Sequence, residues 1–198
     1  MDDVLKGDLT RHLTLGRDAL LWKLESLSEY DVRRPVVRTG TNLLGLVKHL
    51  ACVEAWYFGA VFGRPFGEPL PWWDDDAEPN SDMWATAHES REDIVGLYRR
   101  ACVHADATIA ALDLGTVGVV PWWTPDGRIT LHRMLVTVVA ETHRHAGHAD
   151  IVRELVDGQV GFMPDNGNLP PWQQDTWLTH RDRVEAAARQ AEEAAPAG

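Results

Sequence analysis

The stretch at residues 130–158 reads TLHRMLVTVVAETHRHAGHADIVRELVDG and predicts one long helix. Thr130 can act as the N-cap by accepting a hydrogen bond, and apolar residues then recur at helical spacing. Asp157 and Gly158 end the pattern, because glycine commonly follows the last turn of a helix. We therefore expect a helix from about Thr130 to Val156.

Three further helices are expected upstream, and their predicted ranges are 9–27, 42–62 and 81–112. Thr41 or Asn42 can cap the second helix, and Ser81 or Asp82 can cap the third. The connection at 63–80 is rich in Gly and Pro, which favours a loop. Because no segment alternates convincingly like a strand, the sequence predicts an all-α fold, a four-helix bundle in which this long connection permits a crossover.

One domain over residues 1–178 is expected, because a chain of 198 residues suits a single core with an appended tail. Residues 179–198 have high helix propensity but almost no large apolar side chains. We expect this tail to be a solvated short helix, over about 182–194, that frays toward the C-terminus.

The composition excludes several classes of partner. The formal net charge is −11, and no Lys/Arg cluster exceeds short pairs such as Arg33-Arg34. Nucleic acids and anionic membrane surfaces are therefore not expected partners. No apolar run is long enough to span a membrane, and the N-terminus lacks a signal-peptide pattern, which predicts a cytoplasmic protein. In that compartment the two cysteines would stay as thiols.

Ligand-type residues gather on one side of the last predicted helix. With 3.6 residues per turn, Glu141, His145 and His148 project within about 60° of one another, and His143 falls on about the opposite side. Glu141 and His145 form an i, i+4 pair that can hold one ion. Such pairs also occur on solvated helix faces, but this pair follows the apolar run 134–140.

A third ligand should come from a facing helix, and the second predicted helix offers His49 on a mostly apolar face. A lone histidine there is more often a hydrogen-bonded core residue, so His49 counts only together with Glu141 and His145. One carboxylate and two imidazoles leave open positions on a divalent ion, with Zn²⁺ favoured and Ni²⁺ or Fe²⁺ as alternatives. Cys52 follows His49 by one turn, and we interpret it as a small buried residue.

His148 has two interpretations. It is either an alternative ligand or a group that lines the pocket and contacts substrate, and we favour the second, with a role in proton transfer.

These motifs resemble the DinB-like (DinB/YfiT) metal-binding four-helix bundles, over about residues 10–175. The resemblance is carried by His49 within the block 42–50, by Ala140–Asp150 and by Arg153–Gly158. It is greatest to the branch found mainly in actinobacteria, which is related to mycothiol-dependent maleylpyruvate isomerase and to thiol S-transferases. The flanking Thr130–Arg133 also matches that branch.

The resemblance implies an up-down-down-up bundle with one metal held by His49, Glu141 and His145. Many relatives have His where this chain has Glu141. It also implies a low-molecular-weight thiol such as mycothiol as co-substrate. We therefore expect a divalent-metal-dependent enzyme that activates a thiol for attack on an electrophilic small molecule, as an S-transferase or an isomerase.

The tryptophan side chains of two Pro-Trp-Trp turns, together with one from the second predicted helix, are expected to line the pocket. Loop anchoring and core packing are the alternative roles for these tryptophans. The residues are Trp56, Trp72, Trp73, Trp122 and Trp123.

Other functions remain open at the level of sequence. A hydrolase or isomerase could use the metal without an external thiol, and a non-catalytic bundle could bind metal or a small ligand. A bundle without metal is a further alternative. Association into a homodimer is compatible with such bundles, although the sequence marks no interface.

Overall fold

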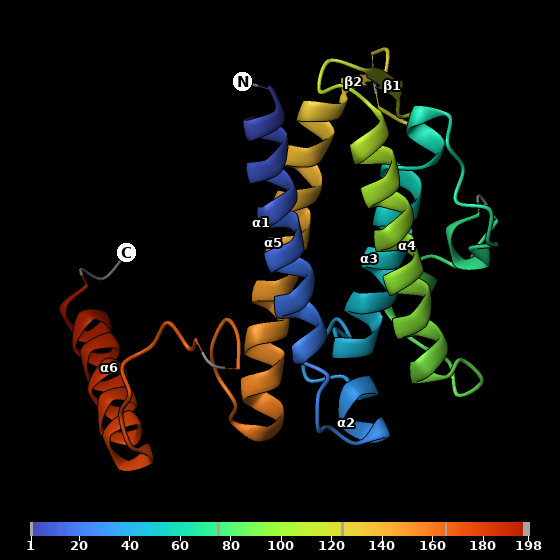
Figure 1. Ribbon diagram of the computed structural model, residues 1–198. Helices are drawn as coiled ribbons and strands as arrows, with labels where there is room; N and C mark the ends of the chain where they lie inside the picture. The colour runs from blue at the N-terminus through green and yellow to red at the C-terminus, as the bar shows by residue number, and fades with distance from the viewer. Residues whose placement is uncertain (1, 75, 124, 165, 196–198) are drawn as a thin grey trace.

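The computed structural model describes residues 2–74, 76–123, 125–164 and 166–195, and it is mainly helical, as the sequence predicts. Residues 196–198 of the expected tail lie outside the described part. Figure 1 shows α1, α3, α4 and α5 side by side, whereas α6 stands apart from them. The elements are α1 (Asp2–Trp22), α2 (Glu29–Arg33), α3 (Leu43–Tyr57), η1 (Ala60–Phe62), η2 (Pro71–Trp73), η3 (Ser81–Met83), α4 (Arg91–Ala111), β1 (Val117–Val119), β2 (Arg128–Thr130), α5 (Leu131–Asp157) and α6 (Gln174–Ala194).

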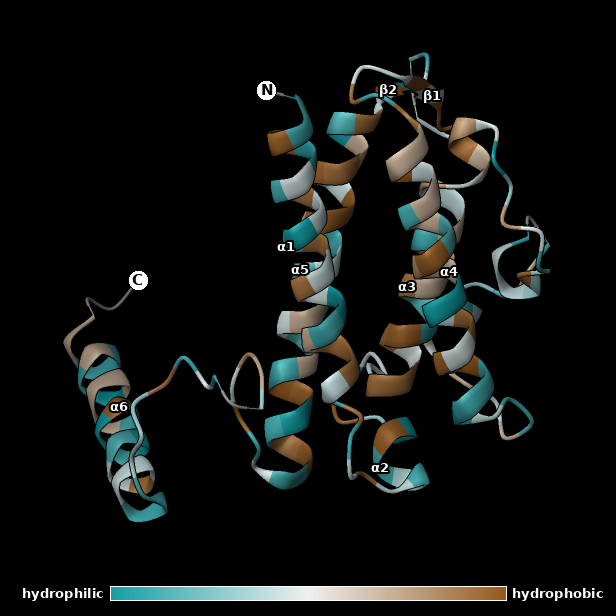
Figure 2. Cartoon of the chain, in the orientation of Figure 1, coloured by the Kyte–Doolittle hydropathy of each residue, from teal (hydrophilic) through white to brown (hydrophobic). Residues whose placement is uncertain are grey.

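The core is centred on α3, which packs against both α4 and α5, while α1 packs against α5. Figure 2 shows hydrophobic residues along much of α3, and nearly every side chain from Leu43 to Ala55 is buried. Burial of this apolar surface is the main favourable term in folding. The side chains that fill the core include Leu13, Leu20, Leu46, Leu50, Leu131, Leu135 and Val138.

Side-chain caps begin the long helices. Asn42 accepts a hydrogen bond from the Gly45 amide at the start of α3, and Thr130 accepts one from the Arg133 amide at the start of α5. Both caps agree with the sequence analysis, in which Thr41 was the alternative to Asn42. Gly158 follows α5 with φ of 76°, a left-handed conformation that glycine adopts without strain.

The start of the third predicted helix was wrong. Residues 81–83 form only the short 3₁₀ turn η3, Trp84 is extended, and α4 begins at Arg91 with Ser90 as its N-cap. Lys48 donates hydrogen bonds to the carbonyl oxygens of Ser81 and Trp84, which hold this segment against α3 in a conformation that is not α-helical.

The first helix also differs from its predicted range of 9–27, because α1 runs from Asp2 to Trp22. Arg153 of α5 donates to the carbonyl oxygens of Lys23 and Glu25, which holds the chain in a turn directly after α1.

A small hairpin precedes α5, although the sequence predicted no strand. Strands β1 and β2 pair antiparallel, with Gly118 opposite Ile129. Each strand has three residues, which is too short for an alternation pattern to be recognised. A Cβ atom on Gly118 would lie 2.6 Å from the Val61 carbonyl oxygen, so this position requires glycine.

Helix α6 is longer than the predicted 182–194 and is exposed along almost its whole length, with Trp177 partly covered. Trp172, Trp177 and His180 pack against one another around its first turns, which explains the earlier start. None of the helices in the described ranges is long and apolar enough to cross a membrane.

Arg17 of α1 should contribute strongly to stability, because its guanidinium holds the fully buried Glu54 carboxylate of α3 through two hydrogen bonds of 2.7 Å. Replacing Arg17 with Met would leave that charge buried without a partner. We expect the free energy of unfolding, measured by urea titration, to fall by about 3–5 kcal/mol.

Arg100→Met is the matched control, because it removes the same charge from an exposed pair with Glu68. We expect it to lower the free energy of unfolding much less, because exposed ion pairs contribute little to stability. Equal losses for the two variants would show that the buried pair has no special role.

Candidate metal centre

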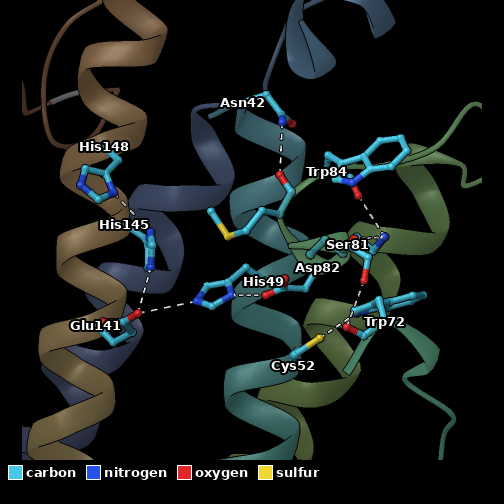
Figure 3. A network of polar contacts seen from close by, with 12 residues as sticks. Asn42, His49, Cys52, Trp72, Ser81, Asp82, Trp84, Glu141, His145 and His148 are labelled. Carbon is cyan, nitrogen blue, oxygen red and sulfur yellow. Dashed lines mark hydrogen bonds and ion pairs between the residues drawn. The ribbon is translucent and has the colours of Figure 1, made fainter. Parts of the chain in front are cut away.

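Two facing helices bring His49, Glu141 and His145 together. One potential ligand atom from each residue lies within 4.8 Å of the other two, a separation that a single metal ion can bridge. Figure 3 shows His49 projecting from α3 toward Glu141 and His145 on α5. The group therefore has the residue types and the convergence that a divalent ion requires.

The geometry follows from simple helical spacing. Glu141 and His145 are one turn apart on α5, and the His145 Nε2 atom lies 3.0 Å from Glu141 Oε1. His49 contributes from α3, with its Nε2 atom 3.6 Å from the same carboxylate oxygen. The rings of His49 and His145 are 4.8 Å apart between centroids.

The two nitrogens of His49 have different surroundings. Nδ1 lies 2.6 Å from Asp82 Oδ2, a short hydrogen bond, whereas Nε2 is buried and has no hydrogen-bond partner among the described residues. An unpaired buried polar atom is costly, and it usually marks a missing ion or water. Because this atom faces the Glu141 and His145 ligand atoms, the three residues fit a divalent ion.

The protonation states also suit a cation. Burial alone would raise the pKa of Glu141, but hydrogen bonds and positive charge from His145 and His49 outweigh it and lower the pKa. Burial lowers the pKa of His145, with a further contribution from positive charge on His49. An ionised carboxylate and a neutral imidazole are the forms that bind metals.

Glu141 is the most exposed of the three candidate ligands. The exposed fractions of the side chains are 31% for Glu141, 16% for His49 and 9% for His145. The carboxylate is thus partly open to solvent, while the imidazoles stay mostly covered.

His148 does not join the three converging residues. It is exposed on α5, and its Nδ1 atom lies 3.3 Å from His145 Nδ1, on the side of that ring away from Glu141. His143 turns to α1, where its Nε2 contacts the His12 carbonyl oxygen at 2.9 Å. Its position away from Glu141 agrees with the helical spacing.

The first Pro-Trp-Trp turn lies beside His49. The Trp73 ring is 6.0 Å from the His49 ring. Trp72 donates from Nε1 to Cys52 Sγ at 2.7 Å, and Lys48 Nζ lies over its ring at 4.3 Å. Trp73 is thus the closer of the two to the candidate ligands, and the contacts of Trp72 anchor the turn to α3.

The second Pro-Trp-Trp turn lies farther along α3. Trp122 packs edge-on against Trp56 with centroids 4.9 Å apart, and Trp123 lies 5.9 Å from Tyr57. Burial raises the pKa of Tyr57, and the negative charge of Glu141 adds to the effect. The two turns therefore contact α3 at separate levels, about two helical turns apart.

The sequence analysis did not identify two residues that lie near the site. Asp82, which we had considered only as a helix cap, contacts His49 from 33 positions away in the chain. Tyr57 lies at the end of α3 beside the second aromatic turn. Neither residue forms a helical-spacing pair with a ligand on α5, so no pattern within one element could have identified it.

We expect the protein to bind one equivalent of Zn²⁺, and His49→Ala, Glu141→Ala and His145→Ala should each weaken binding by more than about 100-fold. The reason is that three ligands are the minimum for a stable site with an open position. Competition with a zinc indicator measures the affinity, and elemental analysis measures the metal content.

His132→Ala is the matched control, because it removes an exposed histidine from the same helix. It should bind Zn²⁺ like the unaltered protein. If the three ligand variants bound Zn²⁺ equally well, the ion would have to lie elsewhere.

A comparison with protein families agrees with this geometry. A family model described as Mycothiol-S-transferase matches residues 8–158, which include most of α1, all of α3, α4 and α5, and all three candidate ligands. No curated protein matches the chain. The match spans about three quarters of the sequence, so the chain belongs to the mycothiol S-transferase family.

Proposed function

We propose that this protein is a metal-dependent enzyme that joins a low-molecular-weight thiol, of the mycothiol type, through its sulfur to an electrophilic small molecule. The observation that carries the proposal is the convergence of His49, Glu141 and His145, in which the buried His49 Nε2 atom has no hydrogen-bond partner among the residues that the structure describes. Membership of the mycothiol S-transferase family supports the choice of thiol. Zn²⁺ is the ion we propose, because two imidazoles and one carboxylate suit it.

The thiol should come from a second substrate rather than from the protein. Burial raises the pKa of the Cys52 thiol to about 12, although the hydrogen bond from Trp72 opposes this. Burial also raises the pKa of Cys102. At neutral pH both cysteines stay protonated, and only a thiolate is a good nucleophile.

The proposed roles of the residues follow from their places. His49, Glu141 and His145 hold the cation, which would lower the pKa of a thiol bound at the open side. As the new sulfur–carbon bond forms, the carbon–halogen bond of a haloalkane or a carbon–oxygen bond of an epoxide breaks, and the halide or alkoxide leaves with the bonding electron pair. The thiol proton is lost in the same reaction, and we assign its acceptance to His148. Trp73 would form the wall beside His49 and limit the access of water.

The finer architecture belongs to the same proposal. We infer an up-down-down-up bundle of α1, α3, α4 and α5, contained in a domain of residues 1–178. The pairing of α1 with α5 and of α3 with α4 supports this order, together with the long connection 58–90 between α3 and α4.

Turnover should require both the metal and the thiol. We expect the Zn²⁺-loaded protein to consume mycothiol in the presence of an electrophile such as a haloalkane or an epoxide, with a thioether as product. Removing the metal with a chelator should abolish turnover, and adding Zn²⁺ should restore it. Mass spectrometry of the product and loss of free thiol are the measurements.

Two results would contradict this function. Turnover of a substrate without any thiol would favour a metal-dependent hydrolase or isomerase. Metal binding without thiol binding or product would favour a non-catalytic metal-binding bundle.

His148→Asn should lower kcat by about 10²-fold or more, because it removes the group assigned to proton transfer. Zn²⁺ content should stay at one equivalent, since His148 is not among the three converging ligands. Steady-state kinetics and elemental analysis on the same sample separate the two effects.

His132→Asn serves as the control on the same helix and should change neither quantity. Loss of the metal in His148→Asn would instead make His148 a ligand.

A further inference from the structure

The turn η3 places Asp82 beside the Nδ1 edge of the His49 ring, the edge that points away from Glu141 and His145. Asp82 Oδ2 is 2.6 Å from His49 Nδ1, and both side chains are mostly buried. A carboxylate oxygen accepts hydrogen bonds, so the His49 Nδ1–H group is the donor in this contact.

This contact also determines which nitrogen of His49 carries the proton. A neutral imidazole has one N–H group and one lone pair. When Nδ1 donates to Asp82, the lone pair is on Nε2, the atom that faces Glu141 and His145. A ligating histidine usually makes such a bond from its other nitrogen to a carboxylate or carbonyl group.

The turn that carries Asp82 is held by a buried lysine. Lys48 Nζ donates to the carbonyl oxygens of Ser81 and Trp84, both at 2.9 Å, so that its two bonds flank Asp82 in the chain. Lys48 also pairs with Glu89 at 2.7 Å, and its side chain is almost fully buried. Because Lys48 precedes His49 on α3, the helix that carries the ligand also anchors its hydrogen-bond partner.

Two further contacts hold the same turn against α3. Asn42 Nδ2 donates to the carbonyl oxygen of Met83 at 3.2 Å. A Cβ atom on Gly45 would overlap that carbonyl group, so the absence of a side chain there permits the close approach. Asn42, Gly45 and Lys48 thus fix the position of η3 along the first two turns of α3.

We propose that Asp82 is a positioning residue for the metal centre, which holds His49 in the Nδ1–H tautomer and aims Nε2 at the ion. Lys48 acts one step farther out, by fixing the turn from which Asp82 reaches His49. The inference rests on the proposed metal centre, and it adds a residue from the connection between α3 and α4 to a site built by α3 and α5. Ser81 Oγ contacts the Trp72 carbonyl oxygen at 3.3 Å, so the first aromatic turn is joined to the same assembly.

The test measures Zn²⁺ affinity and the tautomer of His49 in the same variants. We expect Asp82→Ala to weaken Zn²⁺ binding by about 10- to 100-fold, the usual effect of losing such a partner of a ligating histidine. Asp82→Asn keeps the shape of the side chain and a weaker hydrogen-bond acceptor, so its loss of Zn²⁺ affinity should be smaller than that of Asp82→Ala. In the metal-free protein, ¹⁵N NMR of the imidazole should show protonation at Nδ1, which shifts toward Nε2 in Asp82→Ala.

Glu78→Gln is the matched control for Asp82→Asn, because it neutralises an exposed carboxylate in the same connection. It should leave both the affinity and the tautomer unchanged. Circular dichroism and the midpoint of thermal unfolding report whether a variant is folded, and Asp82→Asn keeps the test decisive if Asp82→Ala does not fold.

Each outcome decides a separate point. If the unaltered protein binds Zn²⁺ and Asp82→Ala or Asp82→Asn binds it equally well with an unchanged tautomer, the positioning role is wrong. If the unaltered protein binds no Zn²⁺, the metal centre fails. In that case the positioning role fails as proposed, even where the NMR spectrum reports the hydrogen bond.

Discussion

The burial of α3 is the constraint on which the rest of the structure depends. This helix lies between α4 and α5, so each polar side chain on it has to find a partner inside the protein. Glu54 pairs with Arg17 of α1, and Lys48 donates hydrogen bonds to carbonyl groups of the connection 58–90. The side chain of Asn42 caps α3 itself. These obligatory pairs fix where α1 and the long connection lie against α3.

His49 differs from the other polar residues of α3. Its Nδ1 atom is paired with Asp82, but its Nε2 atom faces Glu141 and His145 on α5 and has no hydrogen-bond partner in the described part of the chain. Because buried polar groups are usually paired, this atom is the position on α3 at which the structure supports binding of an ion. Helix packing and ligand chemistry, which are independent arguments, lead to the same place.

The elements that the sequence predicted well are those defined by local chemistry. The range of α5, its Thr130 cap and the Glu141–His145 pair all follow from spacing within one helix. The start of α4 and the end of α1 were wrong, because Lys48 and Arg153 bind carbonyl groups from distant segments. Asp82 was missed for the same reason, since its partner is on another element and no periodicity relates them.

This division between local and distant contacts has a consequence for the site itself. The Glu141–His145 half is set by one turn of α5, so it keeps its geometry wherever that helix is formed. The His49 half depends on the packing of α3 against α5 and on the turn that carries Asp82. Changes in the connection 58–90 therefore act on the orientation of a single ligand. They should tune how tightly the ion is held without removing the group that binds it.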